Sequence, residues 1–175
     1  MTKLSAYGKE LHGRPERRKE LARIMMAHGE VYVAQTTPAH LNHFYRAVME
    51  ANDYPGPALI VAYSPCQPEH GIADDASTRQ ARLAVESRAF PLFTYDPRRG
   101  ESLAERLSLQ GNPALREDWT KLPNGEVVDF LAFARTEGRF APHFGKDGAP
   151  TPEILRTQED RLANWHVLQE MAGIR

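Results

Sequence analysis

Residues 54–66 read Tyr54-Pro55-Gly56-Pro57-Ala58-Leu59-Ile60-Val61-Ala62-Tyr63-Ser64-Pro65-Cys66. The apolar run at 58–63 predicts a strand, and the prolines on both sides mark where that strand begins and ends. Earlier in the chain, the run at 31–34 predicts a shorter strand buried on both faces, because it is apolar without alternation. A third strand is predicted at 91–95, where the sequence is Pro91-Leu92-Phe93-Thr94-Tyr95.

Helical patterns fill the segments between these strands. Pro15 predicts the start of a first helix and Gly29 its end. Thr37 predicts the N-cap of a second helix, and either Asp74 or Asp75 caps a third helix that reaches about residue 87. One face of the first helix carries Leu21, Ile24, Met25 and His28, and one face of the second carries Leu41, Phe44, Tyr45 and Val48. This alternation predicts an α/β fold, a parallel sheet flanked by helices.

Beyond residue 96 the sequence becomes irregular and is punctuated by proline and glycine, and two helices are then predicted near 127–137 and 151–172. Thr151 and Pro152 mark the start of the last helix. Its apolar stripe, which should dock on the rest of the chain, consists of Leu155, Leu162, Trp165 and Leu168. We therefore expect two regions: an α/β domain at 1–110, and an irregular and helical C-terminal extension at 111–175 that packs on it.

The composition excludes several classes of function. The net charge is -1 and charges of both signs are interspersed, whereas a nucleic-acid-binding protein needs a basic surplus for its phosphate contacts. No apolar run approaches the ~20 residues that span a bilayer, and residues 1–5 lack the apolar part of a signal peptide. The single cysteine excludes an internal disulfide and indicates a reducing compartment. We expect a cytoplasmic protein without nucleic-acid or membrane partners.

Cys66 is the main candidate for chemistry. It directly follows the strand predicted at 58–63, at the end of the strand where open α/β sheets bind their ligands. Pro65 and Pro68 restrict the loop on either side of it. Two interpretations are open from the residues alone: a small side chain without chemistry, or one ligand of a cluster that thiolates from elsewhere complete.

Other residues give weaker signals. His40 and His43 lie three residues apart on the predicted second helix and could share a metal, but no third ligand is near them. His70 is either a structural loop residue or a donor near the cysteine. The segment 135–140 resembles a helix C-terminus with Gly138 at the stop position, and its charges are either surface decoration or an intersubunit contact. Walker, nucleophile-elbow, GxGxxG and HExxH motifs are absent, so the residues alone predict an α/β domain without a catalytic centre.

Several short segments occur in the same order in one known family. They are Gly8-Lys9, Ala27-His28-Gly29, Val31-Tyr32-Val33-Ala34, His70-Gly71-Ile72, Leu83-Ala84-Val85-Glu86-Ser87, Phe90-Pro91-Leu92, Tyr95-Asp96-Pro97-Arg98 and Asn112-Pro113. Together with residues 54–66, whose Pro-Gly-Pro strand ends in a cysteine, they resemble the C-terminal part of the thiamine-diphosphate domain of pyruvate and other 2-oxoacid:ferredoxin (flavodoxin) oxidoreductases. The resemblance covers nearly the whole chain and weakens after about residue 115.

The resemblance implies an activity and its cofactors. Members of this family decarboxylate a 2-oxoacid oxidatively with coenzyme A and pass electrons through [4Fe–4S] clusters to ferredoxin or flavodoxin. They hold thiamine diphosphate and Mg²⁺ through a GDG motif and a downstream asparagine, which would lie upstream of residue 1. By the same resemblance, 1–110 is a partial thiamine-diphosphate-binding domain. Cys66 is then one ligand of the [4Fe–4S] cluster nearest the thiamine, and three more cysteines come from an earlier segment.

The implied partners are the remainder of the same oxidoreductase and a second copy in a homodimer, and the isolated chain should be inactive and bind no cofactor. The chain departs from the family pattern at two places. One extra residue separates Cys66 from His70, and Arg88-Ala89-Phe90 replaces the usual glycine-aromatic step, which leaves the oxoacid open. The alternative functions are a noncatalytic assembly module, a stand-alone truncated subunit that supports partner chains, and an unrelated α/β binding domain.

Overall fold

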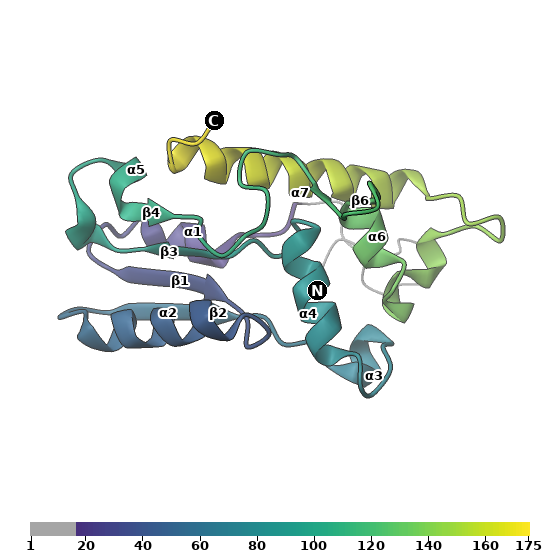
Figure 1. The fold of residues 1–175 in the computed structure, drawn as a ribbon, viewed down its shortest axis with the longest axis horizontal. Coiled ribbons are helices and arrows are strands. Elements are labelled where there is room, and N and C mark those ends of the chain that lie inside the picture. The colour runs from purple at the N-terminus through teal and green to yellow at the C-terminus, as the bar shows by residue number, and fades with distance from the viewer. Residues whose placement is uncertain (1–16) are drawn as a thin grey trace.

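The computed structural model describes residues 17–175, so Pro15, the predicted start of the first helix, lies outside the described residues. Their main feature is a four-stranded sheet with the strand order β2-β1-β3-β4 (Figure 1). The strands of this sheet are β1 Tyr32–Thr36, β2 Ala58–Ala62, β3 Phe93–Tyr95 and β4 Leu107–Ser108. A separate two-stranded hairpin pairs β5 Thr120–Lys121 with β6 Val127–Val128.

Helices flank the sheet, which confirms the predicted α/β class. The α-helices are α1 Leu21–Met26, α2 Leu41–Asp53, α3 Gln67–His70, α4 Ser77–Glu86, α5 Leu103–Arg106, α6 Phe130–Ala134 and α7 Pro152–Met171, and the 3-10 helices are η1 Pro97–Arg99 and η2 Gly138–His143. α7 matches the helix predicted at 151–172, whereas α6 is shorter than the helix predicted at 127–137 because it begins only after its Asp129 cap. No helix within 17–175 combines the length and the apolar character that crossing a membrane requires.

The third strand corrects part of the prediction, because the sheet is mixed and not wholly parallel. β1 and β2 are parallel, whereas β3 runs antiparallel to β1 and β4 antiparallel to β3. A parallel β3 would require a crossover along the face of the sheet. Instead, α4 packs against α6, and the chain re-enters the sheet beside the carboxyl end of β1, where Phe93 lies opposite Gln35 (Figure 1).

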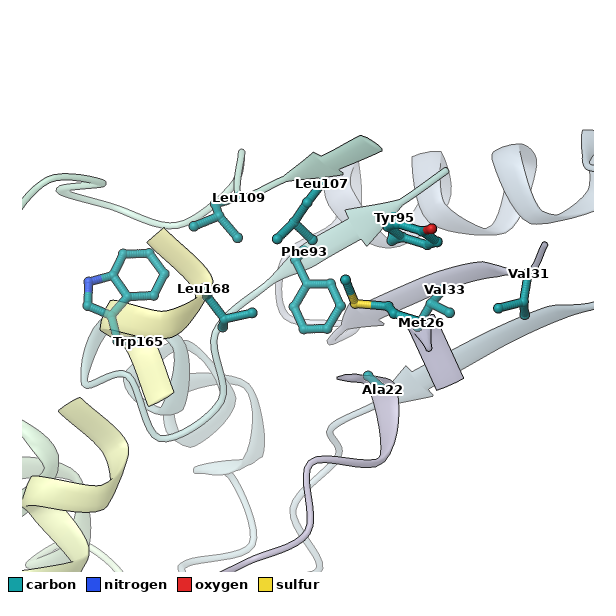
Figure 2. Packing of buried hydrophobic residues seen from close by; sticks show 10 residues of the cluster. All are labelled: Ala22, Met26, Val31, Val33, Phe93, Tyr95, Leu107, Leu109, Trp165 and Leu168. Carbon is teal, nitrogen blue, oxygen red and sulfur yellow. The ribbon is translucent and has the colours of Figure 1, made fainter. Parts of the chain in front are cut away.

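Alternate side chains of β1 point to two different layers. Val33 belongs to the main core, which combines side chains from α1, β1, β3, β4 and α7 (Figure 2). Tyr32 and Ala34 point to the opposite face, where they pack against Ala47 of α2. All five residues of β1 are buried, which confirms that this strand is covered on both faces.

The apolar faces predicted for the first two helices are not the faces that pack on the sheet, although Met25 does pack against the main core. In α1, Leu21 is 54% exposed and Ala22 and Met26 contact the sheet instead. In α2, Leu41 is 56% and Tyr45 63% exposed. The reason is that α2 approaches the sheet through its small residue Ala47 and through His43, which turns its larger apolar side chains outward. The helix also begins later than predicted, because a turn from Thr37 to His40 precedes it.

A second apolar cluster lies beyond the carboxyl ends of β1 and β2, among α4, α6, η2 and α7. It contains three phenylalanines in mutual ring contact, Phe130, Phe133 and Phe140. Its other buried members are Ala84 of α4, Ala89, Phe90, Ala134 and Ile154 of α7. α4 packs on this cluster and also borders the loop that carries Cys66, where the Gln67 amide donates to the Ser77 hydroxyl at 2.9 Å.

Candidate functional site

Cys66 lies in the loop that connects β2 to α4, beyond the carboxyl end of β2. Its backbone is extended and it directly precedes the single turn of α3. The neighbouring Pro65 is buried, whereas the Cys66 thiol is exposed and free. The amide of His70 donates to the Cys66 carbonyl at 2.9 Å, and Gly71 ends the turn in a left-handed conformation. We call residues 63–71 the cysteine loop.

The backbone of the cysteine loop is fixed to a segment that lies far away in sequence. The amide of Gly138 donates to the carbonyl of Gly71 at 3.0 Å. A Cβ atom added at Gly71 would lie 2.8 Å from the Gly138 Cα, so the two backbones approach as closely as they do only because neither residue has a side chain. Gly138 was predicted to stop a helix; α6 instead ends at Ala134, and Gly138 begins η2.

Glu137 adds a side-chain contact at the same place. Its carboxylate is fully buried and accepts hydrogen bonds from the Tyr63 hydroxyl at 3.1 Å and from the Gln80 amide at 3.0 Å. It also forms an ion pair with Arg139. The Nδ1 atom of His70 lies 3.6 Å from the same carboxylate, and the His70 ring stacks on the Tyr63 ring.

The surroundings of Tyr63 and His70 shift the pKa of each group and thereby set its protonation state at neutral pH. Burial lowers the pKa of His70, the Arg139 guanidinium lowers it further, and the Glu137 carboxylate opposes both effects. Burial also raises the pKa of Tyr63, and the nearby Glu137 charge raises it further. Tyr63 is therefore a protonated donor, and His70 is neutral beside a buried anion that Arg139 compensates.

His40 and His43 do not form a metal site with any described residue. His43 is buried and its Nδ1 lies 2.8 Å from the Thr36 hydroxyl, which indicates a structural hydrogen bond. Burial lowers the pKa of both histidines. In the part of the chain from 17 to 175, no three side chains of His, Cys, Asp or Glu gather closely enough to hold a metal ion.

The chemistry that these residues support is correspondingly narrow. A [4Fe–4S] cluster takes four thiolates, and this sequence has one cysteine. The exposed thiol of Cys66 is therefore at most one of the four thiolates that such a cluster needs. The role of Glu137 was missed from the sequence. No short-range sequence pattern indicated it, because its partners Tyr63 and Gln80 lie more than fifty residues away in the chain.

Comparisons with known proteins place the chain in a family. No protein-family model matches it. It is 44% identical over 103 residues to the probable pyruvate-flavodoxin oxidoreductase of Escherichia coli, a match that covers 58% of this chain and 9% of that protein. It is 34% identical over 174 residues to the pyruvate-flavodoxin oxidoreductase of Rhodospirillum rubrum, covering 98% of this chain and 13% of that protein.

A shorter relative is the pyruvate synthase subunit PorB of Thermotoga maritima, which is 29% identical over 139 residues, or 74% of this chain and 42% of that subunit. The chain therefore spans less than half the length of each of these three relatives. The matches extend over nearly the entire chain, including the cysteine loop. This chain belongs to the pyruvate-flavodoxin/ferredoxin oxidoreductase family, and it corresponds to one segment of such an enzyme.

Proposed function

We propose that the chain is the C-terminal segment of the thiamine-diphosphate part of a 2-oxoacid:ferredoxin or flavodoxin oxidoreductase, and that Cys66 supplies one thiolate to a [4Fe–4S] cluster of that enzyme. The observation that carries the proposal is the placement of Cys66. It is the single cysteine of the sequence, it is exposed beyond the carboxyl end of β2, and its loop is held at both ends by buried contacts. The names of the relatives favour pyruvate as the oxoacid.

The complete enzyme would decarboxylate the oxoacid oxidatively with coenzyme A. The bound cluster would accept single electrons and deliver them to ferredoxin or flavodoxin. This chain's own contribution is to present a thiolate from a fixed loop. In this proposal residues 1–110 belong to the thiamine-diphosphate-binding domain, residues 111–175 form an extension packed on it, and the parent is a homodimer.

A second candidate function is a noncatalytic module that supports partner chains. The observation that favours it is the outward face of α2, where Leu41, Tyr45 and Met49 are all more than half exposed. Such a contiguous apolar face is typical of a surface that a partner covers. The same face also fits the first proposal, in which the rest of the oxidoreductase covers it.

The sequence that precedes residue 1 in the gene, together with an activity assay, separates the two candidates. A preceding GDG motif, a downstream asparagine and further cysteines are expected for the oxidoreductase. The assembled protein should then reduce ferredoxin or flavodoxin with pyruvate only when coenzyme A and thiamine diphosphate are present. A stop codon directly upstream, together with partner chains that are fully active without this one, would favour the supporting module.

A further inference from the structure

The buried carboxylate of Glu137 joins segments that flank Cys66 on both sides. Tyr63, three residues before the cysteine, donates to Glu137 Oε1 at 3.1 Å. His70, four residues after the cysteine, places its Nδ1 3.6 Å from the same oxygen. One anion that belongs to the C-terminal extension therefore contacts the beginning and the end of the cysteine loop.

The wider surroundings of Glu137 hold this carboxylate in place. The Gln80 Nε2 of α4 donates to Glu137 Oε1 at 3.0 Å, and the Gln80 Oε1 accepts a hydrogen bond from the Thr136 hydroxyl at 2.9 Å. Arg139 supplies the compensating charge. Because a buried carboxylate is costly unless it is paired and hydrogen-bonded, moving Glu137 out of this arrangement would cost free energy.

A backbone contact fixes the same two segments independently of the side chains. Gly71 closes the cysteine loop in the left-handed region, with φ at 63°, and its carbonyl accepts from the Gly138 amide. The residue that follows Glu137 is therefore in direct backbone contact with the last residue of the loop. Displacement of Glu137 would be transmitted to both flanks of Cys66.

We propose that Glu137 is a positioning residue for Cys66, through which the C-terminal extension sets the direction and solvent exposure of the thiolate. The inference rests on the proposed function of Cys66 as a cluster ligand. The potential of an iron–sulfur cluster depends on hydrogen bonding and solvent exposure around its sulfurs. A change at Glu137 should therefore alter the electronic properties of the cluster without removing a ligand.

The first test uses the 175-residue chain. Since Cys66 is its only cysteine, a nitroxide attached there reports only on the cysteine loop. Glu137→Gln removes the anion and places a donor opposite Arg139, so the EPR line shape should gain a mobile component. Glu137→Asp, which keeps the charge, should recover part of the immobile line shape. The matched control is Ile154→Val, which removes one methylene from the neighbouring apolar cluster and leaves the hydrogen bonds of Glu137 in place.

The outcomes of this test are distinct. A wild-type line shape in Glu137→Gln would overturn the positioning role. So would an Ile154→Val variant that has the same unfolding free energy as Glu137→Gln and shows the same gain in nitroxide mobility. If Glu137→Gln does not fold, Tyr63→Phe replaces it, because this change deletes one hydrogen bond to Glu137 and keeps the ring. A wild-type line shape in Tyr63→Phe would then overturn the inference.

The second test uses the complete oxidoreductase and separates this inference from the proposed function. Glu137→Gln should keep the wild-type iron content and shift the midpoint potential of one cluster, whereas Ile154→Val should leave that potential unchanged. If Cys66→Ala removes a cluster but Glu137→Gln changes no potential, the proposed function stands and the positioning role is wrong. If Cys66→Ala removes no cluster, the proposed function fails, even where Glu137→Gln changes the mobility of the loop.

Discussion

The guanidinium of Arg88 lies 4.2 Å from the centre of the Trp165 ring, and this contact joins the segment entering β3 to α7. Arg88 is fully buried and has a left-handed backbone, with φ at 57°. Its guanidinium donates to the carbonyls of Ala114 at 3.0 Å and Asp118 at 3.3 Å. A positive φ is strained for a residue that carries a side chain and is free of strain only in glycine. Here the arginine compensates for its backbone strain with buried contacts.

Arg88 should therefore be important for stability. Arg88→Lys loses the planar donors and the stacking on Trp165, and we expect the free energy of unfolding to fall by roughly 2–4 kcal/mol. Arg88→Gly should be less destabilising than Arg88→Ala by about 1 kcal/mol, because glycine adopts the left-handed backbone without strain. Urea denaturation followed by circular dichroism measures both differences. The exposed Arg82→Lys is the control, and equal stabilities of the Gly and Ala variants would contradict the backbone argument.

His43 should make the stability depend on pH. Burial, followed by the charges of Arg46 and His40, lowers the pKa of His43 from 6.5 to about 4. Because the folded pKa is below the unfolded one, the contribution is complete above about pH 6.5 and is lost as the pH falls toward 4. We expect a loss of about 2 kcal/mol between pH 7.5 and 5 from this group. His43→Asn keeps a hydrogen-bond partner for Thr36, and in urea titrations its free energy of unfolding should fall by about 2 kcal/mol less than that of the wild type over the same pH range. Equal losses in the wild type and the variant would disprove the assignment to His43.

The outer face of α2 should drive association of the isolated chain. Tyr45 is 63% and Met49 67% exposed, and β2 has a neighbouring strand on only one side in the described sheet. Both features favour contact with another protein surface. Sedimentation velocity should show self-association at high micromolar concentration, which Tyr45→Lys combined with Met49→Lys abolishes. Leu21→Lys, at an exposed apolar residue of α1, should not abolish it. A wild-type chain that stays strictly monomeric would contradict this prediction.

The isolated chain should not bind thiamine diphosphate with useful affinity. The resemblance implies that a GDG motif holds the diphosphate, and this sequence contains none. Isothermal titration calorimetry with thiamine diphosphate and Mg²⁺ should therefore give no binding heat in the micromolar range, with the complete oxidoreductase as the positive control. Mg²⁺-dependent micromolar binding by the 175 residues would contradict the expectation that the diphosphate site lies outside this chain.

The sequence was sufficient for those features that depend on local pattern. The continuous apolar run of β1, the prolines around β2 and the Thr151-Pro152 start of α7 each act within a few residues, and these elements lie where they were predicted. The direction of β3 was not predictable in this way, because it depends on α4 packing against the phenylalanines of α6. The outward face of α2 was missed for a related reason: helical periodicity identifies an apolar stripe but not the surface that covers it.

In the candidate site, too, local features were predictable from the sequence and long-range contacts were not. The position of Cys66 follows from the end of a predictable strand, whereas the contact of its loop with Glu137 spans more than sixty residues of sequence. No short-range pattern encodes such a contact. His43 illustrates the converse, because its spacing from His40 suggested a metal and its burial against Thr36 shows a structural role.

The central claim is that Cys66 is a cluster ligand, and low-temperature EPR of the reduced, complete oxidoreductase tests it most directly. Cys66→Ala removes one of four thiolates, and a cluster with three protein thiolates is prone to lose iron. The variant should lack the EPR signal and the iron of one cluster and should fail to reduce ferredoxin or flavodoxin. Thiamine-dependent decarboxylation should largely persist in it. Ser64→Ala, in the same loop, should retain every signal. A Cys66→Ala enzyme with all cluster signals and wild-type acceptor reduction would contradict the account.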